Sequence, residues 1–157
     1  MSTLSLIARK TWQRTGYPAV ASGLVSAVAL LWRGRTELRR SAAPINAPSH
    51  WVWGDRALRQ DGVTWRYTAL GTVTHLASAM FWGVLYDLLR RRRRQPTLGN
   101  AVVDAALVTG TAACVDLVVV PQRLTPGFER RLSRPGLAWV YAGFMAGLVA
   151  GAALAKR

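Results

Sequence analysis

Two ionisable residues in otherwise apolar stretches, His75 and Asp116, are the best candidates for chemistry in this sequence. A charged group inside a bilayer is costly, so it marks either a functional site or a polar contact between helices. If the two stretches are antiparallel helices, both residues lie at a similar depth. A carboxylate beside an imidazole can then relay a proton or orient a ligand-binding nitrogen. The alternative is that His75 only donates a hydrogen bond that links two helices.

Two further acids, Asp87 and Asp104, lie close to a run of five arginines, Arg90 to Arg94. Asp87 and Arg91 are four residues apart, a spacing at which opposite charges on a helix attract each other. Long arginine side chains can also reach towards both acids. We interpret this cluster as a structural anchor, because no nucleophile or set of metal ligands accompanies the carboxylates.

The connections at the same end as His75 and Asp116 are rich in tryptophan and arginine. We predict that four of their residues form a binding site for an anionic lipid headgroup or a small acid, namely His50, Trp51, Arg66 and Arg123. The alternative is that these side chains only anchor the helices at the membrane surface, where tryptophan and arginine are common.

No metal site and no cofactor are predicted. A metal needs three or four donors, whereas the sequence offers only His50, His75, Cys114 and scattered acids without a ligand-spacing motif. The phosphate-loop, dinucleotide-binding and G-x-S-x-G fingerprints are also absent from the sequence. We therefore favour a protein that is not an enzyme. A membrane enzyme or small transporter that uses His75 and Asp116 is the alternative.

Four apolar stretches organise the chain, at residues 17–32, 68–89, 98–120 and 136–155. Each has the composition of a membrane-spanning helix, although the first would rise only about 24 Å across a hydrocarbon core about 30 Å thick. We predict an all-α fold in which residues 1–157 form a single integral membrane domain, a bundle of four transmembrane helices. Short interfacial helices are expected after Ser49, up to Arg59, and after Thr125, because a capping residue there precedes aromatic or basic side chains.

Small residues recur every four positions in two of these stretches. The second stretch carries Gly71, Ala79 and Gly83, with His75 at the position between the first two, and the last carries Gly143, Gly147 and Gly151. Rows of this kind let the backbones of neighbouring membrane helices approach closely. We predict that both rows are helix-packing surfaces, and that the last helix packs against a partner within the chain.

The net charge of +14 would also suit a protein that binds nucleic acid. In this chain, however, the arginines bracket apolar runs of about 20 residues, the length of a membrane span, and lipid phosphates account for them. We expect the bilayer, and anionic lipids in particular, as partners, and no nucleic acid.

The distribution of basic residues leaves the orientation in the membrane open. Ten Lys and Arg lie on the side of both termini and the Arg90 to Arg94 turn, and eleven lie on the other side. The first side has no acids in its connections and concentrates five arginines in one short turn, which favours N-in and C-in. The near-tie also permits both orientations, as in small dual-topology transporters.

Three strings of residues, NAPSHWVWGD at 46–55, HLASAMFWGVLYD at 75–87 and RLTPGFERRLS at 123–133, resemble a group of small uncharacterised bacterial inner-membrane proteins with four predicted spans. The resemblance covers most of the chain from Ser22 onward. It implies the bacterial inner membrane and brings no activity with it. We therefore expect a structural or accessory role through helix packing and contact with lipid or protein, as a homo-oligomer or as a subunit of a membrane complex.

Overall fold

The computed structural model describes residues 5, 11–95 and 97–155, among which no strand occurs. Arg9, Lys10, Lys156 and Arg157, which entered the charge comparison, lie outside these residues. The described chain forms four long helical segments, in order η1 (Trp12–Gly16) with α2 (Tyr17–Leu38), η4 (Trp65–Ala69) with α5 (Leu70–Arg91), α6 (Leu98–Cys114) with η5 (Val115–Val119), and α7 (Arg134–Leu154). The elements η1, η4 and η5 are single π-helical stretches. The prediction of an all-α, four-helix fold is confirmed.

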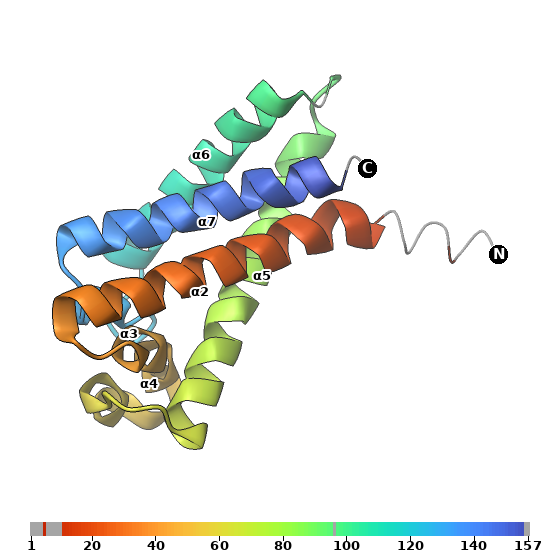
Figure 1. Ribbon diagram of the computed structural model, residues 1–157. Coiled ribbons are helices and arrows are strands. Elements are labelled where there is room, and N and C mark those ends of the chain that lie inside the picture. The colour runs from red at the N-terminus through yellow and green to blue at the C-terminus, as the bar shows by residue number, and fades with distance from the viewer. Residues whose placement is uncertain (1–4, 6–10, 96, 156–157) are drawn as a thin grey trace.

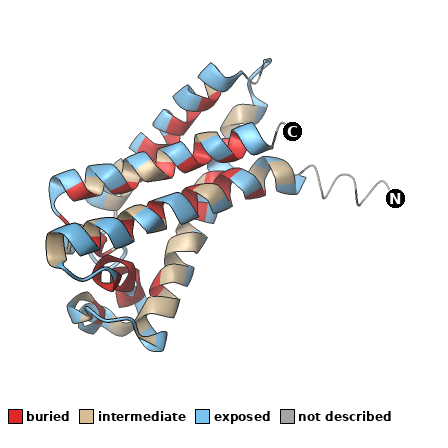
Figure 2. Ribbon diagram, in the orientation of Figure 1, coloured by how far each residue is buried: buried red, intermediate tan, exposed pale blue. Residues whose placement is uncertain are grey.

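All four segments are long and apolar enough to cross a membrane. Their buried residues form stripes that face the interior of the bundle, and the opposite faces are exposed (Figure 2). Those exposed faces are apolar, as Val28 and Val118 illustrate with 64% and 77% of their surface exposed. Because large hydrophobic side chains cover the outside, the described chain has the surface of a multi-pass membrane protein.

The first helix is longer than the sequence predicted, because α2 continues beyond Trp32 to Leu38. Arg33 does not end it, since its Nε donates a hydrogen bond of 3.0 Å to Glu37 one turn later. Glu37 in turn accepts hydrogen bonds from the amide and the hydroxyl of Ser133, at 2.8 and 2.9 Å. The end of α2 is therefore tied to the start of α7. Arg39, with φ 59°, takes the left-handed conformation that commonly follows a helix.

Helices α2 and α7 are antiparallel and lie side by side (Figure 1). A Cβ atom added at Gly147 would stand 2.6 Å from the Ala21 carbonyl oxygen, and one at Gly151 would be equally close to the backbone of α2. Gly143 faces α2 with more space. The glycine row of the last helix thus packs α7 against the first helix of the same chain.

The small-residue row on α5 faces two different neighbours. A Cβ atom at Gly83 would stand 2.8 Å from the Ala19 Cα atom of α2, and Ala79 is buried beside Gly23 of the same helix. Gly71, in contrast, lies against the carbonyl group of Ile45 in the connection between α2 and α5. Only part of this row is therefore a contact between two long helices.

That connection is not a polar loop with one surface helix. It forms four short helical pieces, α3 (Ala42–Asn46), η2 (Ala47–Ser49), α4 (His50–Trp53) and η3 (Gly54–Arg59), and residues 42–50 are all buried. The expected continuous helix from His50 to Arg59 is wrong, because Gly54 takes φ 60° and breaks it. The segment 42–50, which we call the inserted segment, packs between α2 and α5.

Asn46 holds the inserted segment in place. Its side chain is fully buried, and its amide donates hydrogen bonds to the carbonyl oxygens of Gln60 and Gly62 at 3.0 and 2.9 Å. Its side-chain oxygen accepts a bond of 2.7 Å from the Thr68 hydroxyl at the start of the second long helix. Asn46 thereby joins three parts of the chain, and its polar atoms are satisfied without water.

The second predicted interfacial helix shrinks to one 3₁₀ turn, η6 (Phe128–Arg130). It begins after Gly127, at φ 85°, instead of at Thr125, whose hydroxyl bonds to the Gln122 carbonyl oxygen. Phe128 and Leu132 are both buried with residues of α2 and the inserted segment. This connection therefore closes over one end of the bundle.

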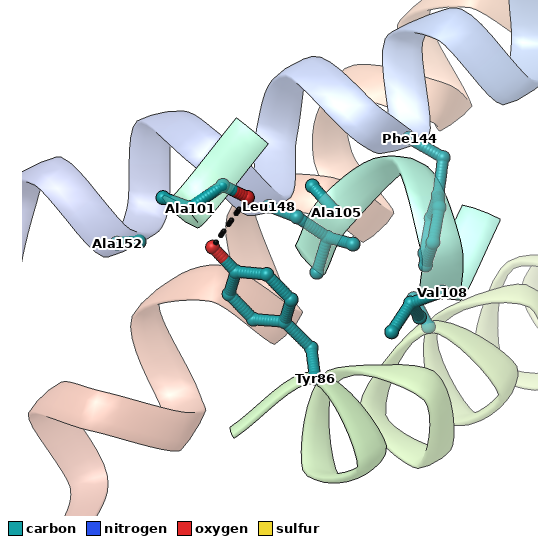
Figure 3. Packing of buried hydrophobic residues seen from close by; sticks show 8 residues of the cluster. Tyr86, Ala101, Ala105, Val108, Phe144, Leu148 and Ala152 are labelled. Carbon is teal, nitrogen blue, oxygen red and sulfur yellow. Dashed lines mark hydrogen bonds between the residues drawn. The ribbon is translucent and has the colours of Figure 1, made fainter. Parts of the chain in front are cut away.

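The opposite end is fixed by the α5 to α6 turn. In the apolar core there, Tyr86 is fully buried and its hydroxyl donates to the Ala101 carbonyl oxygen at 3.3 Å (Figure 3). Asp104 is also fully buried and accepts a bond of 2.6 Å from Arg93, which raises the pKa of the Arg93 guanidinium. Asp87 accepts bonds of 2.9 Å from Arg91 and 2.7 Å from the Thr15 hydroxyl. The prediction that both acids pair with the arginine run is confirmed.

Candidate functional site

Helices α5 and α6 diverge with distance from the arginine-rich turn that joins them (Figure 1). Residues of both helices line a cavity of about 580 Å³, which we call the lateral cavity. Its other walls come from η5, α7 and the two long connections, and α2 contributes Ser26. Six of the lining residues are aromatic, namely Trp51, Phe81, Trp82, Phe128, Tyr141 and Phe144. Both the volume and the predominance of apolar walls are typical of sites for small molecules.

His75 lines this cavity from α5 and is bonded to α2. Its Nε2 atom lies 2.9 Å from the Ser26 hydroxyl oxygen and 3.2 Å from the Gly23 carbonyl oxygen. The Ser26 hydroxyl donates its own hydrogen to the Ser22 carbonyl oxygen at 2.7 Å, so it accepts from His75. This network assigns a hydrogen to Nε2. His75 is therefore a polar link between two packed helices.

Asp116 lines the cavity from η5, near the end of the third long helix. Its Oδ2 atom accepts a hydrogen bond of 3.0 Å from the Tyr141 hydroxyl of α7. Tyr141 is itself part of the cavity wall, and its ring lies edge-on to that of Phe128. The carboxylate is thus positioned by the last long helix.

The expectation that His75 and Asp116 could bond to each other is not met. Their similar depth does bring them to one cavity, but His75 takes its partners from α2 and Asp116 takes its partner from α7. The reason is that depth fixes only the position along a helix, whereas the rotation of each helix decides which neighbour a side chain meets.

The lateral cavity has an unusual charge for this protein. No Lys or Arg is among the described residues that line it, although the sequence carries 21 of them. Among the described residues, the ion pairs do not include Asp116. A second carboxylate, Glu129 of η6, follows the lining residue Phe128 in sequence but is not itself part of the lining, and it pairs with Arg130 at 3.8 Å. The cavity therefore has a local excess of negative charge.

A second hollow, of about 630 Å³, lies among the two connections, and we call it the headgroup hollow. His50, Trp51 and Arg123 line it together, in agreement with the predicted grouping. Arg66 is not part of its lining, but its guanidinium stacks 4.0 Å from the ring centre of Trp53, which belongs to that lining. Three of the four predicted residues are thus brought to one site, and the fourth supports its wall.

His50 and Trp51 connect the headgroup hollow to the rest of the fold. The Nδ1 atom of His50 lies 3.0 Å from the Ala47 carbonyl oxygen, and its Nε2 atom is buried without a hydrogen-bond partner among the described residues. Trp51 donates from Nε1 to the Thr125 carbonyl oxygen at 2.8 Å. Because Trp51 lines both the hollow and the lateral cavity, its indole forms part of the partition between them.

Metal ligation finds no support in the described part of the chain, where no group of three or more His, Cys, Asp and Glu residues could hold an ion. Cys114 is exposed.

No protein-family model, curated protein or solved structure matches the chain.

Sequence reasoning did not find Ser26 and Tyr141 as partners of the two ionisable residues. By residue type alone, Ser26 is a small residue suited to helix packing, which gives no sign of a bond to His75. Tyr141 carried a signal that could have been used, because a buried tyrosine hydroxyl in a membrane helix needs a hydrogen-bond partner.

Proposed function

We propose that this chain is a multi-pass protein of the bacterial inner membrane with a structural or accessory role, and that its lateral cavity holds an amphipathic molecule from the bilayer. The observation that carries the proposal is the lining of the cavity, which is apolar and aromatic apart from a few polar groups such as His75 and Asp116. Such a lining buries the apolar body of a ligand and orients its polar part.

The hydrogen bonds of the two ionisable residues support a structural role for them. His75 links α5 to α2, and Asp116 links η5 to α7. Hydrogen bonds of this kind hold membrane helices together. The same bonds keep the walls of the lateral cavity at fixed positions, so that helix packing and ligand binding depend on one another.

The test is native mass spectrometry of the purified protein released from membranes with its lipids retained. We expect a bound amphipathic molecule, and we expect Ala77→Trp to reduce its occupancy, because Ala77 is exposed and lines the cavity. Ala106→Trp is the matched control, since Ala106 is exposed on α6 and is outside the lining. Equal occupancy in both variants would contradict the proposal. The same spectra report whether the protein forms a homo-oligomer.

The headgroup hollow is proposed to receive the anionic headgroup of a surface lipid. Arg123 lines the hollow, and Arg130 in its wall is already paired with Asp55 at 3.5 Å. Arg123 is therefore the cation that we expect to bind a phosphate. Arg123→Gln should reduce retention of anionic lipid but not of zwitterionic lipid. An unchanged lipid profile would assign the residue to surface anchoring.

For the orientation, we propose that both termini and the α5 to α6 turn face the cytoplasm. A protein with Cys114→Ala and Arg92→Cys has a single thiol in that turn. A membrane-impermeant maleimide should label it in inverted vesicles and not in intact spheroplasts. Labelling from both sides would indicate dual topology instead.

A membrane enzyme or small transporter is the second candidate, favoured by the presence of His75 and Asp116 in one cavity. This hypothesis requires that His75→Ala abolishes the cellular phenotype of the gene while the amount and oligomeric state of the protein stay the same. If the phenotype survives, His75 is a structural residue.

A further inference from the structure

We infer that the molecule held in the lateral cavity is a hydrophobic organic cation, bound by the Asp116 carboxylate and the aromatic rings around it. The inference rests on the proposed function, because it names the charge of the molecule for which the cavity is proposed to be the site. It is supported by the charge of Asp116 and by the aromatic composition of the lining.

The first argument is that the negative charge of Asp116 is not compensated. Its hydrogen-bond partner is the neutral Tyr141 hydroxyl, and the described ion pairs do not include it. Among the described residues of the lining, the other ionisable side chains are Tyr141 and His75, and Nε2 of His75 is bonded to α2. A carboxylate in an apolar site is favourable only beside a positive charge or as its neutral form.

A second carboxylate, that of Glu129, lies next in sequence to the lining residue Phe128. Its Oε2 atom is buried without a hydrogen-bond partner among the described residues, and its Oε1 atom lies 3.8 Å from the Nε atom of Arg130. Because Glu129 is not part of the lining, Asp116 is the acid that a ligand in the cavity would contact. In such an apolar space charges attract more strongly than in water.

The second argument is the aromatic character of the walls. Trp82, Tyr141 and Phe144 line the cavity together with three further rings. The face of an aromatic ring attracts a cation that is close to it, and the attraction is stronger when water is excluded. An anion would meet both the Asp116 carboxylate and the negative ring faces. The cavity therefore selects against the anionic lipids that the arginine-rich surfaces attract.

Binding of two ions of the same shape and opposite charge tests the inference directly. Tetraphenylphosphonium and tetraphenylborate are compared with neutral triphenylphosphine oxide by titration of the full-length protein in detergent. We expect the phosphonium to bind most tightly. Asp116→Asn should weaken the affinity for the phosphonium about tenfold or more, in line with the loss of a charge-assisted contact. The affinity for the neutral probe should stay unchanged.

Two variants serve as controls. Asp116→Glu keeps the charge and should keep the preference for the phosphonium. Asp61→Asn removes one negative charge at the surface, where 47% of the Asp61 side chain is exposed, and should have no effect because Asp61 lines neither cavity. An Asp116→Asn protein that still bound the phosphonium as tightly as the unchanged protein would overturn the inference.

The neutral probe separates this inference from the proposed function. If Ala77→Trp blocks the neutral probe but the phosphonium has no advantage over it, the cavity binds amphipathic molecules and its assigned charge preference is wrong. If Ala77→Trp changes the binding of none of the three probes, both the proposed function and the inference fail.

Discussion

Gly147→Ala is expected to destabilise the protein by forcing α2 and α7 apart. The added methyl group would stand 2.6 Å from both the Ala21 carbonyl oxygen and the Ser22 amide nitrogen, which belong to the backbone and cannot rotate away. Comfortable contacts need about 3.5 Å, so the helices must separate by about 1 Å at this point. Overpacking of this kind costs about 1–3 kcal/mol.

The substitution also has a favourable effect, because alanine in a helix is about 0.5–1 kcal/mol better than glycine. Gly110→Ala provides the control for that effect, since nothing lies within 4 Å of a Cβ atom added at Gly110. The difference between the two variants isolates the packing cost of about 1–3 kcal/mol. Gly147→Leu should separate the helices altogether.

The assay is unfolding in mixed micelles by increasing fractions of dodecyl sulfate, followed by circular dichroism. Gly147→Ala should unfold at a lower dodecyl sulfate fraction than the unchanged protein, and Gly110→Ala at an equal or higher one. If the two alanine variants unfold together, α2 and α7 are not packed as closely as described, and the account of the glycine row is refuted.

Three other substitutions can be measured in the same assay. Asn46→Ala should cost at least about 1–3 kcal/mol, because it leaves buried polar groups without their partner; no loss would show that the inserted segment is held by packing alone. Asp104→Asn should cost about 3–5 kcal/mol, as expected for breaking a buried ion pair, because it removes the partner of both Arg93 and Arg90, and the Arg90 side chain is only 10% exposed; stability equal to the unchanged protein would contradict this. Glu37→Gln should cost only about 0.3–1 kcal/mol, as expected for losing an anion at the start of α7, and a loss larger than that of Asp104→Asn would reverse the expected order of the two variants.

The long helices could be predicted because apolar length is a property of sequence alone. Their ends were harder to predict. The sequence places the end of the first span before Arg33, since a charge normally leaves the bilayer, but the ion pair of Arg33 with Glu37 lets α2 continue to Leu38. Such a pair neutralises the arginine within the helix. A predicted span that ends at the first arginine is therefore too short.

The inserted segment shows a different limit. Pro44 and Pro48 favour a polar connection at residues 42–50, yet these residues carry no charge apart from the titratable His50. These residues fit between α2 and α5. The Asn46 amide donates hydrogen bonds to the carbonyl oxygens of Gln60 and Gly62 in the same connection. Such packing depends on the space between two helices, which the sequence of one connection does not contain.

The candidate site was predicted in part. The depth argument brought His75 and Asp116 to one cavity, and the grouping of His50, Trp51 and Arg123 also agrees with the fold. The partners could not be predicted in the same way, because they depend on how each helix is rotated against its neighbours. The local excess of negative charge was likewise hidden by a sequence that is strongly basic as a whole.

The contact between α2 and α7 joins the first and the last of the four described long helices, and α2 is synthesised before α7. About 100 residues separate them, so at about 5–20 residues per second the small-residue face of α2 waits roughly 5–20 s for its partner. During that time the face is open to other helices in the membrane. A chain that stops before Arg134 lacks α7, so this face of α2 keeps no partner from that helix.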